Sequence, residues 1–205
     1  MSARYGFNYI ELGHEDFLTR HIVTPQLTLI EPNFGYTSAY YQFQARDFKG
    51  DPATPELDRD GPLHALGVVQ GIQLPEFFRD AGRANLELTY RFELQDTDGD
   101  DFEGNFHSFG VTLYTPLPLW KLKGDVGVSY DIDDYANPNS LDDDNDERSD
   151  REINFVAGLT REFNKNFAVR VDYAYTDHDS NIEVGGSDVF SFDRYQLGVR
   201  LIFSY

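Results

Sequence analysis

The last eleven residues, Tyr195-Gln-Leu-Gly-Val-Arg-Leu-Ile-Phe-Ser-Tyr205, decide the fold of this chain. Apolar and aromatic side chains occupy every second position of this stretch: Tyr195, Leu197, Val199, Leu201, Phe203 and Tyr205. The positions between them are mostly polar or small. A period of two is typical of a β-strand with one apolar and one polar face. We therefore expect the chain to end in an amphipathic strand.

Composition favours a single all-β domain, residues 1–205, over a helical membrane protein. Hydrophobic residues make up 40% of the chain. No apolar run approaches the roughly 18–20 residues that a transmembrane helix needs. The formal net charge is −19, from 36 acidic residues against 17 Lys and Arg, which argues against binding to nucleic acid or bare anionic lipid through a basic surface. There is no Cys and therefore no disulfide or thiolate site.

The alternation continues through the chain as ten candidate strands. We expect them at about residues 4–12, 21–30, 36–46, 63–74, 85–95, 106–115, 120–132, 153–161, 167–176 and 195–205. Every second connection is long and acidic: residues 13–20, 47–61, 96–104, 133–152 and 177–193. Transmembrane β-barrels sort their connections in this way, with tight periplasmic turns and long external loops. The pattern predicts an antiparallel up-and-down transmembrane barrel of about ten strands, with both termini periplasmic.

The strands repeat as hairpins. His21, His64 and His107 are spaced 43 residues apart, each near the start of an even-numbered strand. His64-Ala-Leu-Gly-Val68 matches His107-Ser-Phe-Gly-Val111 in frame. Hairpin repetition favours an up-and-down barrel over a Greek-key sandwich. We expect the histidines in an outward-facing belt at the external interface, without a metal.

Ten apolar rows hold more bulk than a small barrel interior accepts, so we expect them to face lipid and the charged rows to face the lumen. Leu88, Tyr90, Val171 and Tyr173 exemplify the lipid row. The predicted lumen charges are Arg46, Glu87, Arg91, Glu93, Lys121, Lys123, Asp125, Arg170, Asp172 and Arg200. The lumen also receives Gly67, Gly110, Gly158 and Gly198, which either permit sheet curvature or widen a cavity.

The closing stretch resembles the last strand of bacterial outer-membrane β-barrels, which alternates and ends in an aromatic residue. The resemblance implies location in the outer membrane and contact with its lipid and lipopolysaccharide. It also implies that Tyr195, Leu197, Val199, Leu201, Phe203 and Tyr205 form the signal for the barrel assembly machinery. No signal peptide follows Met1, so we expect a mature form or an excised piece.

Catalytic and metal chemistry have few candidates. His178, between Asp177 and Asp179, resembles the Asp-His couple at the rim of outer-membrane proteases. No second acidic pair is recognisable on the opposite wall, so we expect a solvated loop histidine and no enzymatic activity. We expect no cofactor and acidic loops that are solvated and repel one another, with loosely bound Ca²⁺ or Mg²⁺ as the alternative. The weak metal candidates are Asp142, Asp143, Asp144, Asp146, Asp98 and Asp100.

The segment Asp177-His-Asp-Ser-Asn181, followed by Phe192-Asp-Arg194, Leu197-Gly198 and Phe203, is similar to the C-terminal barrels of surface lipoprotein assembly modifiers. Those proteins often carry periplasmic tetratricopeptide repeats. The resemblance implies a membrane anchor or a narrow export-associated pore, with an exported protein or polysaccharide as partner. A structural or adhesive surface protein working through acidic loops is the second hypothesis, and a rim-located hydrolase is the third.

Overall fold

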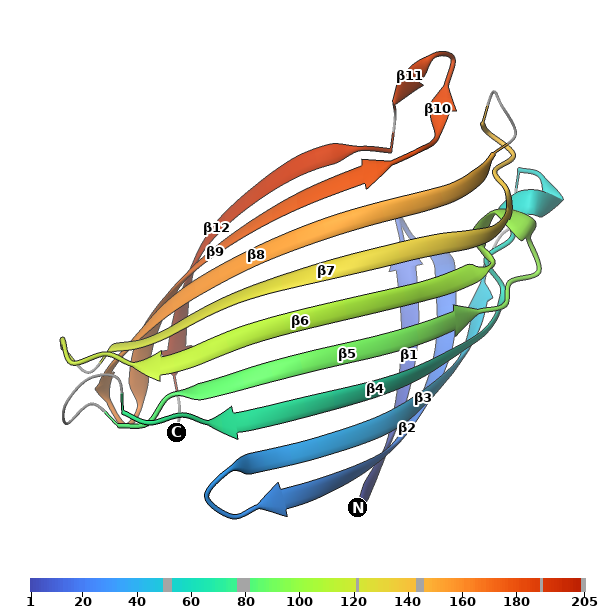
Figure 1. Cartoon of the computed structure of the whole chain (residues 1–205). Coiled ribbons are helices and arrows are strands. Elements are labelled where there is room, and N and C mark those ends of the chain that lie inside the picture. The colour runs from blue at the N-terminus through green and yellow to red at the C-terminus, as the bar shows by residue number, and fades with distance from the viewer. Residues whose placement is uncertain (50–52, 77–81, 121, 143–145, 189, 204–205) are drawn as a thin grey trace.

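The computed structural model describes residues 1–49, 53–76, 82–120, 122–142, 146–188 and 190–203. These residues form an all-β, antiparallel structure with twelve strands and two short 3₁₀ helices, whose arrangement is shown in Figure 1. The elements are β1 (Ser2–Leu12), β2 (Glu15–Glu31), β3 (Gly35–Phe48), η1 (Pro55–Leu57), β4 (Gly61–Gln73), β5 (Asn85–Gln95), η2 (Asp100–Phe102), β6 (Gly104–Pro116), β7 (Leu122–Pro138), β8 (Glu147–Asn164), β9 (Phe167–Ser180), β10 (Glu183–Val184), β11 (Ser187–Asp188) and β12 (Phe192–Phe203). No helix in the described residues is long and apolar enough to cross a membrane.

Ten strands form one curled sheet in the order β1 to β9 and then β12, each paired with its sequence neighbour. The short strands β10 and β11 form a separate hairpin that projects beyond β9 and β12 (Figure 1). No ladder joins β1 to β12 among the described residues, so the sheet is not closed. The predicted count of ten therefore fits the main sheet but misses the extra hairpin, and the structure shows a curled sheet where a closed barrel was expected.

The missed hairpin falls in the predicted loop 177–193. It turns through Gly185 and Gly186, both with positive φ (61° and 68°), as a two-residue turn of the mirror-image type requires. The first predicted long loop, residues 13–20, is also wrong. Gly13 and His14 (φ 62° and 75°) make a tight turn, and β2 begins at Glu15. The charged ends of long strands have the same residue composition as a loop, so composition did not distinguish the two.

Connections are also less regularly sorted than the sequence suggested. At the end that carries both termini, the connection between Gln73 and Asn85 is as long as several loops at the far end. At that far end, β7 runs to Pro138 and β8 begins at Glu147, which shortens the predicted loop 133–152 from both sides. The strands therefore rise well beyond the length that a hydrocarbon core needs, and their outer parts are polar.

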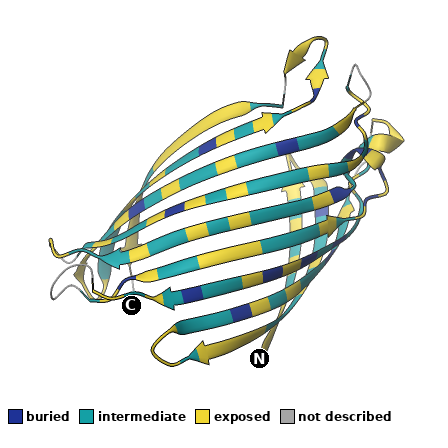
Figure 2. Cartoon of the chain, in the orientation of Figure 1, coloured by how far each residue is buried: buried dark blue, intermediate teal, exposed yellow. Residues whose placement is uncertain are grey.

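Exposed and less exposed residues alternate along the central strands (Figure 2). The apolar rows lie on the exposed, convex face: Leu88 is 41% exposed, Val171 43% and Val199 66%. Among the described residues, the buried hydrophobic side chains are few: Leu18, Leu63, Ala65, Ala84 and Ile182. Such a small apolar interior cannot stabilise a water-soluble domain of this size. The large apolar surface faces outward and needs an apolar surrounding.

The outward face carries a belt of aromatic and histidine side chains. Phe7 is in register with His21, Phe43 with His64, and Phe92 with His107. A tyrosine two residues earlier on each odd strand hydrogen-bonds the histidine Nδ1: Tyr5 at 2.8 Å, Tyr41 at 2.6 Å and Tyr90 at 3.0 Å. Three hairpins thus repeat one arrangement. The amphipathic rings suit a membrane interface.

Candidate functional site

The concave face holds a chain of ion pairs near the end that carries the termini. Arg170 on β9 pairs with Asp125 on β7 through two bonds, Nη1 to Oδ1 at 2.6 Å and Nη2 to Oδ2 at 2.9 Å. Arg170 also pairs with Asp172, which accepts two further bonds of 2.9 Å from Arg200 on β12. Four of the residues proposed to face the lumen are therefore linked in one network that spans β7 to β12.

Glycine residues on the concave face receive the side chains of neighbouring strands. The Tyr40 ring lies over Gly67 and the Tyr36 ring over Gly71, so a Cβ at either glycine would overlap the ring. The Arg170 guanidinium lies in the same way over Gly158. A Cβ at Gly110 would meet the Thr89 hydroxyl. Neighbouring side chains therefore occupy the space beside these glycines, and the widened cavity that was one of the two alternatives does not form there. Of the four glycines predicted to face the lumen, only Gly198, on the edge strand, has open space beside it.

A second polar cluster occupies the concave face toward the far end. Arg91 pairs with Glu93 and donates to Gln42 Oε1 at 3.3 Å. Arg46 donates from Nη1 to Gln95 Oε1 at 2.9 Å, and its Nε and Nη2 are buried without a hydrogen-bond partner. Gln44, only 7% exposed, leaves its Oε1 without a partner as well. Buried unpaired donors and acceptors are rare because each costs free energy.

The opposite part of this cluster is acidic, and the sequence analysis missed it. Asp131, Asp133 and Glu152 lie on the concave face of β7 and β8, and Asn154 donates to Asp131 at 3.2 Å and to Glu152 at 2.7 Å. The signal was available, since Asp131 belongs to the polar row of the predicted strand 120–132, and Asp133 and Glu152 continue the polar rows just past the predicted strand ends.

His178 is the clearest correction in the site. It lies on β9 with a side chain 11% exposed, where the sequence predicted a solvated loop residue. Its Nδ1 is 3.1 Å from Glu152 Oε2 and its Nε2 is 3.4 Å from Asp150 Oδ2, while its ring stacks on Phe192. Asp150 is in turn held by Arg148 through two bonds of 3.0 and 2.6 Å. Residues 147–152 therefore form part of β8, where the sequence predicted a long acidic connection, residues 133–152.

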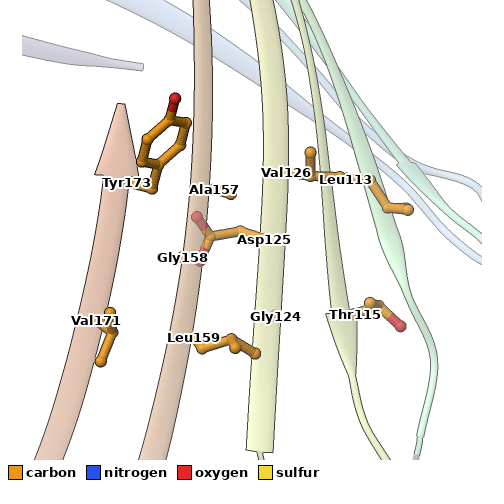
Figure 3. A pocket seen from close by; sticks show the side chains of 10 residues that line it. All are labelled: Leu113, Thr115, Gly124, Asp125, Val126, Ala157, Gly158, Leu159, Val171 and Tyr173. Atoms are coloured by element: carbon orange, nitrogen blue, oxygen red, sulfur yellow. The ribbon is translucent and has the colours of Figure 1, made fainter. Parts of the chain in front are cut away.

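Two cavities on opposite faces accompany these clusters. One, of about 410 Å³, is lined by side chains of the polar cluster that include Arg91, Glu93, Gln95, Asp131, Asp133 and Glu152. The other, of about 320 Å³, is an apolar hollow on β6 to β9, lined by Leu113, Val126, Leu159, Val171 and Tyr173 (Figure 3). Gly124 and Ala157 lie within this hollow (Figure 3), which therefore has the chemistry of a site for a lipid chain.

The remaining proposed lumen residues are placed apart from these networks. Glu87 accepts a hydrogen bond of 2.7 Å from the Tyr36 hydroxyl. Lys123 pairs with Glu162 at 2.6 Å, and both side chains are largely exposed at the end that carries the termini. Lys121 lies outside the described residues.

The candidate metal ligands are dispersed. Asp142 accepts from the Asp146 and Glu183 amides at 2.8 and 3.2 Å, and Asp100 begins η2. Asp143 and Asp144 lie outside the described residues. Of the candidates that the structure describes, only Asp98 joins a group of carboxylates close enough to share an ion, together with Asp58 and Asp60.

This acidic group affects the titration of the loop between β3 and β4. Burial raises the pKa of the Asp60 carboxyl above its ordinary value, and the charges of Asp58, Asp47 and Asp98 add to the rise. The Phe48 amide, which donates to this carboxyl, acts in the opposite direction.

The residues proposed as the assembly signal form the exposed row of β12. Tyr195, Leu197, Val199, Leu201 and Phe203 are each more than 60% exposed, because β12 is an edge strand with no neighbour on one side. Tyr205 lies outside the described residues.

Comparison with known proteins agrees with this geometry. The model of the outer membrane protein beta-barrel domain matches residues 30–203, which is most of the chain. No curated protein and no solved structure matches the sequence. A curled antiparallel sheet with an apolar convex face, a charged concave face and a match of this extent lead to one conclusion. The chain belongs to the outer-membrane β-barrel domain family and is a protein of the bacterial outer membrane.

Proposed function

We propose that this protein is a closed ten-stranded barrel that anchors in the outer membrane and encloses a narrow, export-associated lumen, without enzymatic activity. The observation that carries the proposal is the crowding of the concave face by charges that pair with one another. Asp125, Arg170, Asp172 and Arg200 line one end, and the cluster around Arg91 lines the other. Ten strands enclose little space beyond such side chains.

Closure between β1 and β12 is supported by the register of the sheet. Following the ladder pairs across all strands from Ser2, the first residue of β1, leads to Phe192, the first residue of β12. If Ala3 instead pairs with Phe203, then β1 and β12 overlap along almost their full lengths. Relative to the path from Ser2 to Phe192, this pairing is displaced by one residue on β1 and by eleven residues on β12. The total offset between the two ends of the sheet is therefore 12 residues.

Two independent features agree with this register. An offset of 12 residues at about 3.3 Å each, over ten strands about 4.8 Å apart, gives a strand tilt of about 40°, within the range of known barrels. The same register places Tyr5 opposite Leu201, Phe7 opposite Val199 and Tyr9 opposite Leu197, so that the apolar rows of both strands face outward together.

Disulfide trapping tests closure, because the chain contains no Cys of its own. The double variant Phe7→Cys/Val199→Cys should form an intramolecular crosslink under mild oxidation in vesicles. Tyr9→Cys/Leu197→Cys should behave in the same way. Phe7→Cys/Leu88→Cys, which joins β1 to β5, is the matched control and should not crosslink within one chain. Dimers linked between chains, or no crosslink from either test pair, would contradict closure.

Planar-bilayer recording tests the narrow lumen. The wild-type protein should give low conductance, and Arg170→Ser/Arg200→Ser should raise conductance or cation preference because two fixed positive charges leave the lumen. Large and stable porin-like currents from the wild type would rule out a narrow lumen. An exported protein or polysaccharide is the partner that this proposal implies.

An adhesive or structural surface role is the second candidate, and the order of the far-end loops favours it. The Asp98 and Gly99 amides donate to the Asp60 and Asp58 carbonyls at 2.8 and 3.1 Å. Asp101, 2% exposed, accepts two bonds from Ser140 at 2.9 and 2.6 Å. A fixed acidic platform can recognise a basic partner. Loss of cell or matrix attachment on charge-neutralising loop substitution, with the barrel intact, would select this role over export.

A further inference from the structure

The Arg46 guanidinium presents one complete edge without a partner. Its Nη1 donates to Gln95, whereas Nε and Nη2 are buried and make no hydrogen bond. These two nitrogens form the side of the fork that binds a carboxylate through two parallel bonds. Leaving a charged donor buried and unpaired is costly. An oxyanion at this edge would remove the cost.

Among the residues that the structure describes, no carboxylate bonds to this edge of Arg46. The charged groups that act on it are Glu93, Arg20 and Asp60. Glu93 is paired with Arg91, and Asp60 accepts from the Phe48 amide. Arg20 is a like charge whose own fork donates to the neutral Asn8 Oδ1, at 3.3 and 3.1 Å.

Gln44 adds a buried, unpaired acceptor on the same face of β3. It precedes Arg46 by two positions along the strand, is 7% exposed, and leaves Oε1 without a partner. The wall of β3 therefore offers two donors and one acceptor that the described residues do not use. A solute carrying a carboxylate fits the donors.

The charge of the cavity beside β3 determines which chemical group the other end of the solute must carry. Gln95, which holds Arg46, lines the cavity of about 410 Å³ together with Asp131 and Asp133. The Asp133 carboxylate makes no hydrogen bond or ion pair within the described part of the chain. With Glu93 and Glu152 also lining it, against Arg91 alone, the cavity repels a bare anion. A cationic group on the same solute turns this repulsion into attraction.

We propose that the far half of the lumen binds a small zwitterionic solute, with its carboxylate on the Nε–Nη2 edge of Arg46 and its ammonium on Asp133. The edge is closed to solvent in this structure, so the solute enters from the cavity and displaces amide side chains such as Gln95. The inference rests on the closed barrel proposed above, and it names the class of solute that the lumen would recognise.

Calorimetry on the folded protein in detergent tests the inference with three matched probes: 6-aminohexanoate, hexanoate and hexylammonium. We expect saturable binding of 6-aminohexanoate and much weaker binding of the two singly charged probes. Arg46→Gln and Asp133→Asn should each weaken 6-aminohexanoate binding by at least about tenfold, the effect of losing one charge-assisted contact. Glu87→Gln, on the same concave face but bonded to Tyr36, is the control and should bind normally.

Three results would overturn the inference. Equal binding of hexanoate, unaffected by Asp133→Asn, would make the site a plain anion site. Equal binding of hexylammonium, unaffected by Arg46→Gln, would make it a plain cation site. Absence of binding by all three probes would leave no site. If the Phe7→Cys/Val199→Cys crosslink forms while binding fails, this inference fails alone and the closed barrel stands.

Discussion

Replacing Gly158 with Ala tests whether the Asp125–Arg170 pair stabilises the barrel. Gly158 lies on β8, between the two strands that carry the pair, and the guanidinium crosses over it. A Cβ at this position would lie 2.6 Å from Arg170 Cζ and 2.7 Å from Asp125 Oδ2, closer than ordinary contacts allow. The guanidinium must move, and the pair opens.

The magnitude follows from the geometry of the pair. It is bidentate, and its Arg and Asp side chains are 23% and 13% exposed. Hydrogen bonds to charged groups contribute about 1.5–3 kcal/mol, and partial exposure to lumen water places this pair at about 2–3 kcal/mol in total. Ala restricts the unfolded chain more than Gly does and returns about 0.5–1 kcal/mol. We expect a net loss of about 1–2.5 kcal/mol in the free energy of unfolding.

Urea unfolding of the vesicle-embedded protein measures this loss, with the single tryptophan, Trp120, as the fluorescent probe. Gly198→Ala is the matched control. Both glycines are in register with Asp172, one from each side, but a Cβ at Gly198 meets nothing within 4 Å. In the closed barrel Asn8 would face this position, so we expect no change or a small gain. The two substitutions should therefore differ in sign.

A double-mutant cycle with Asp125→Asn identifies the cause. If Gly158→Ala acts by opening the ion pair, its cost must shrink once Asp125 carries no charge, since neighbouring substitutions that remove one interaction are not additive. An unchanged cost in the Asp125→Asn background would refute the reasoning. So would a loss from Gly198→Ala as large as that from Gly158→Ala, because only one of these sites has a side chain to displace.

Three further predictions concern the lipid face and the loops. Val171→Arg, on the convex face, should cost about 2–4 kcal/mol in the same urea assay if this position lies near the bilayer midplane, and no cost would place it outside the membrane. Asp60→Asn keeps the acceptor for the Phe48 amide and removes a charge, so it should slow hydrogen exchange of the Asp98 amide at neutral pH. Because the pKa of the Asp60 carboxyl is raised in the folded state, its contribution to the free energy of unfolding is present below the ordinary carboxyl pKa and is lost as the pH rises through the raised value. Weaker protection of the Asp98 amide at acidic pH, after correction for the intrinsic exchange rate, would contradict this. Calorimetry with Ca²⁺ and Mg²⁺ should show weak, unselective binding that falls with Asp98→Asn, whereas tight and selective binding would show a dedicated site.

The period of two was sufficient to predict the strands and their faces, because each residue of a strand points to the opposite side from its neighbour. It could not predict where the strands end. Glu147 to Glu152 are as polar as a loop, yet they form the outer part of β8, where water and not lipid surrounds the sheet. The Gly185–Gly186 turn shows the reverse case. Its sequence signal was present, but its two short strands were hidden within a polar stretch.

Partners across the sheet were beyond sequence reasoning, because they depend on register. Asp125 and Arg170 belong to strands that are not adjacent, and only the offsets of β8 against β7 and β9 bring them together. His178 shows the same dependence. Its flanking acids, Asp177 and Asp179, suggested a solvated residue, whereas its contacts are Asp150 and Glu152 on the neighbouring strand. Alternation gives the face of a residue but not its neighbour.

The two halves of the concave face differ in how their long side chains are held, and this difference bears on what the lumen does. Near the termini, Tyr36 and Arg170 lie over Gly71 and Gly158 and are bonded at their tips to Glu87 and Asp125. Side chains held in this way have little freedom, so in the proposed closed barrel this half would form a fixed constriction. At the far end Arg46 ends on an amide and leaves one edge unpaired. A solute can compete with an amide far more easily than with a seated ion pair. Selectivity in this protein should therefore arise at the far end, before a solute reaches the constriction.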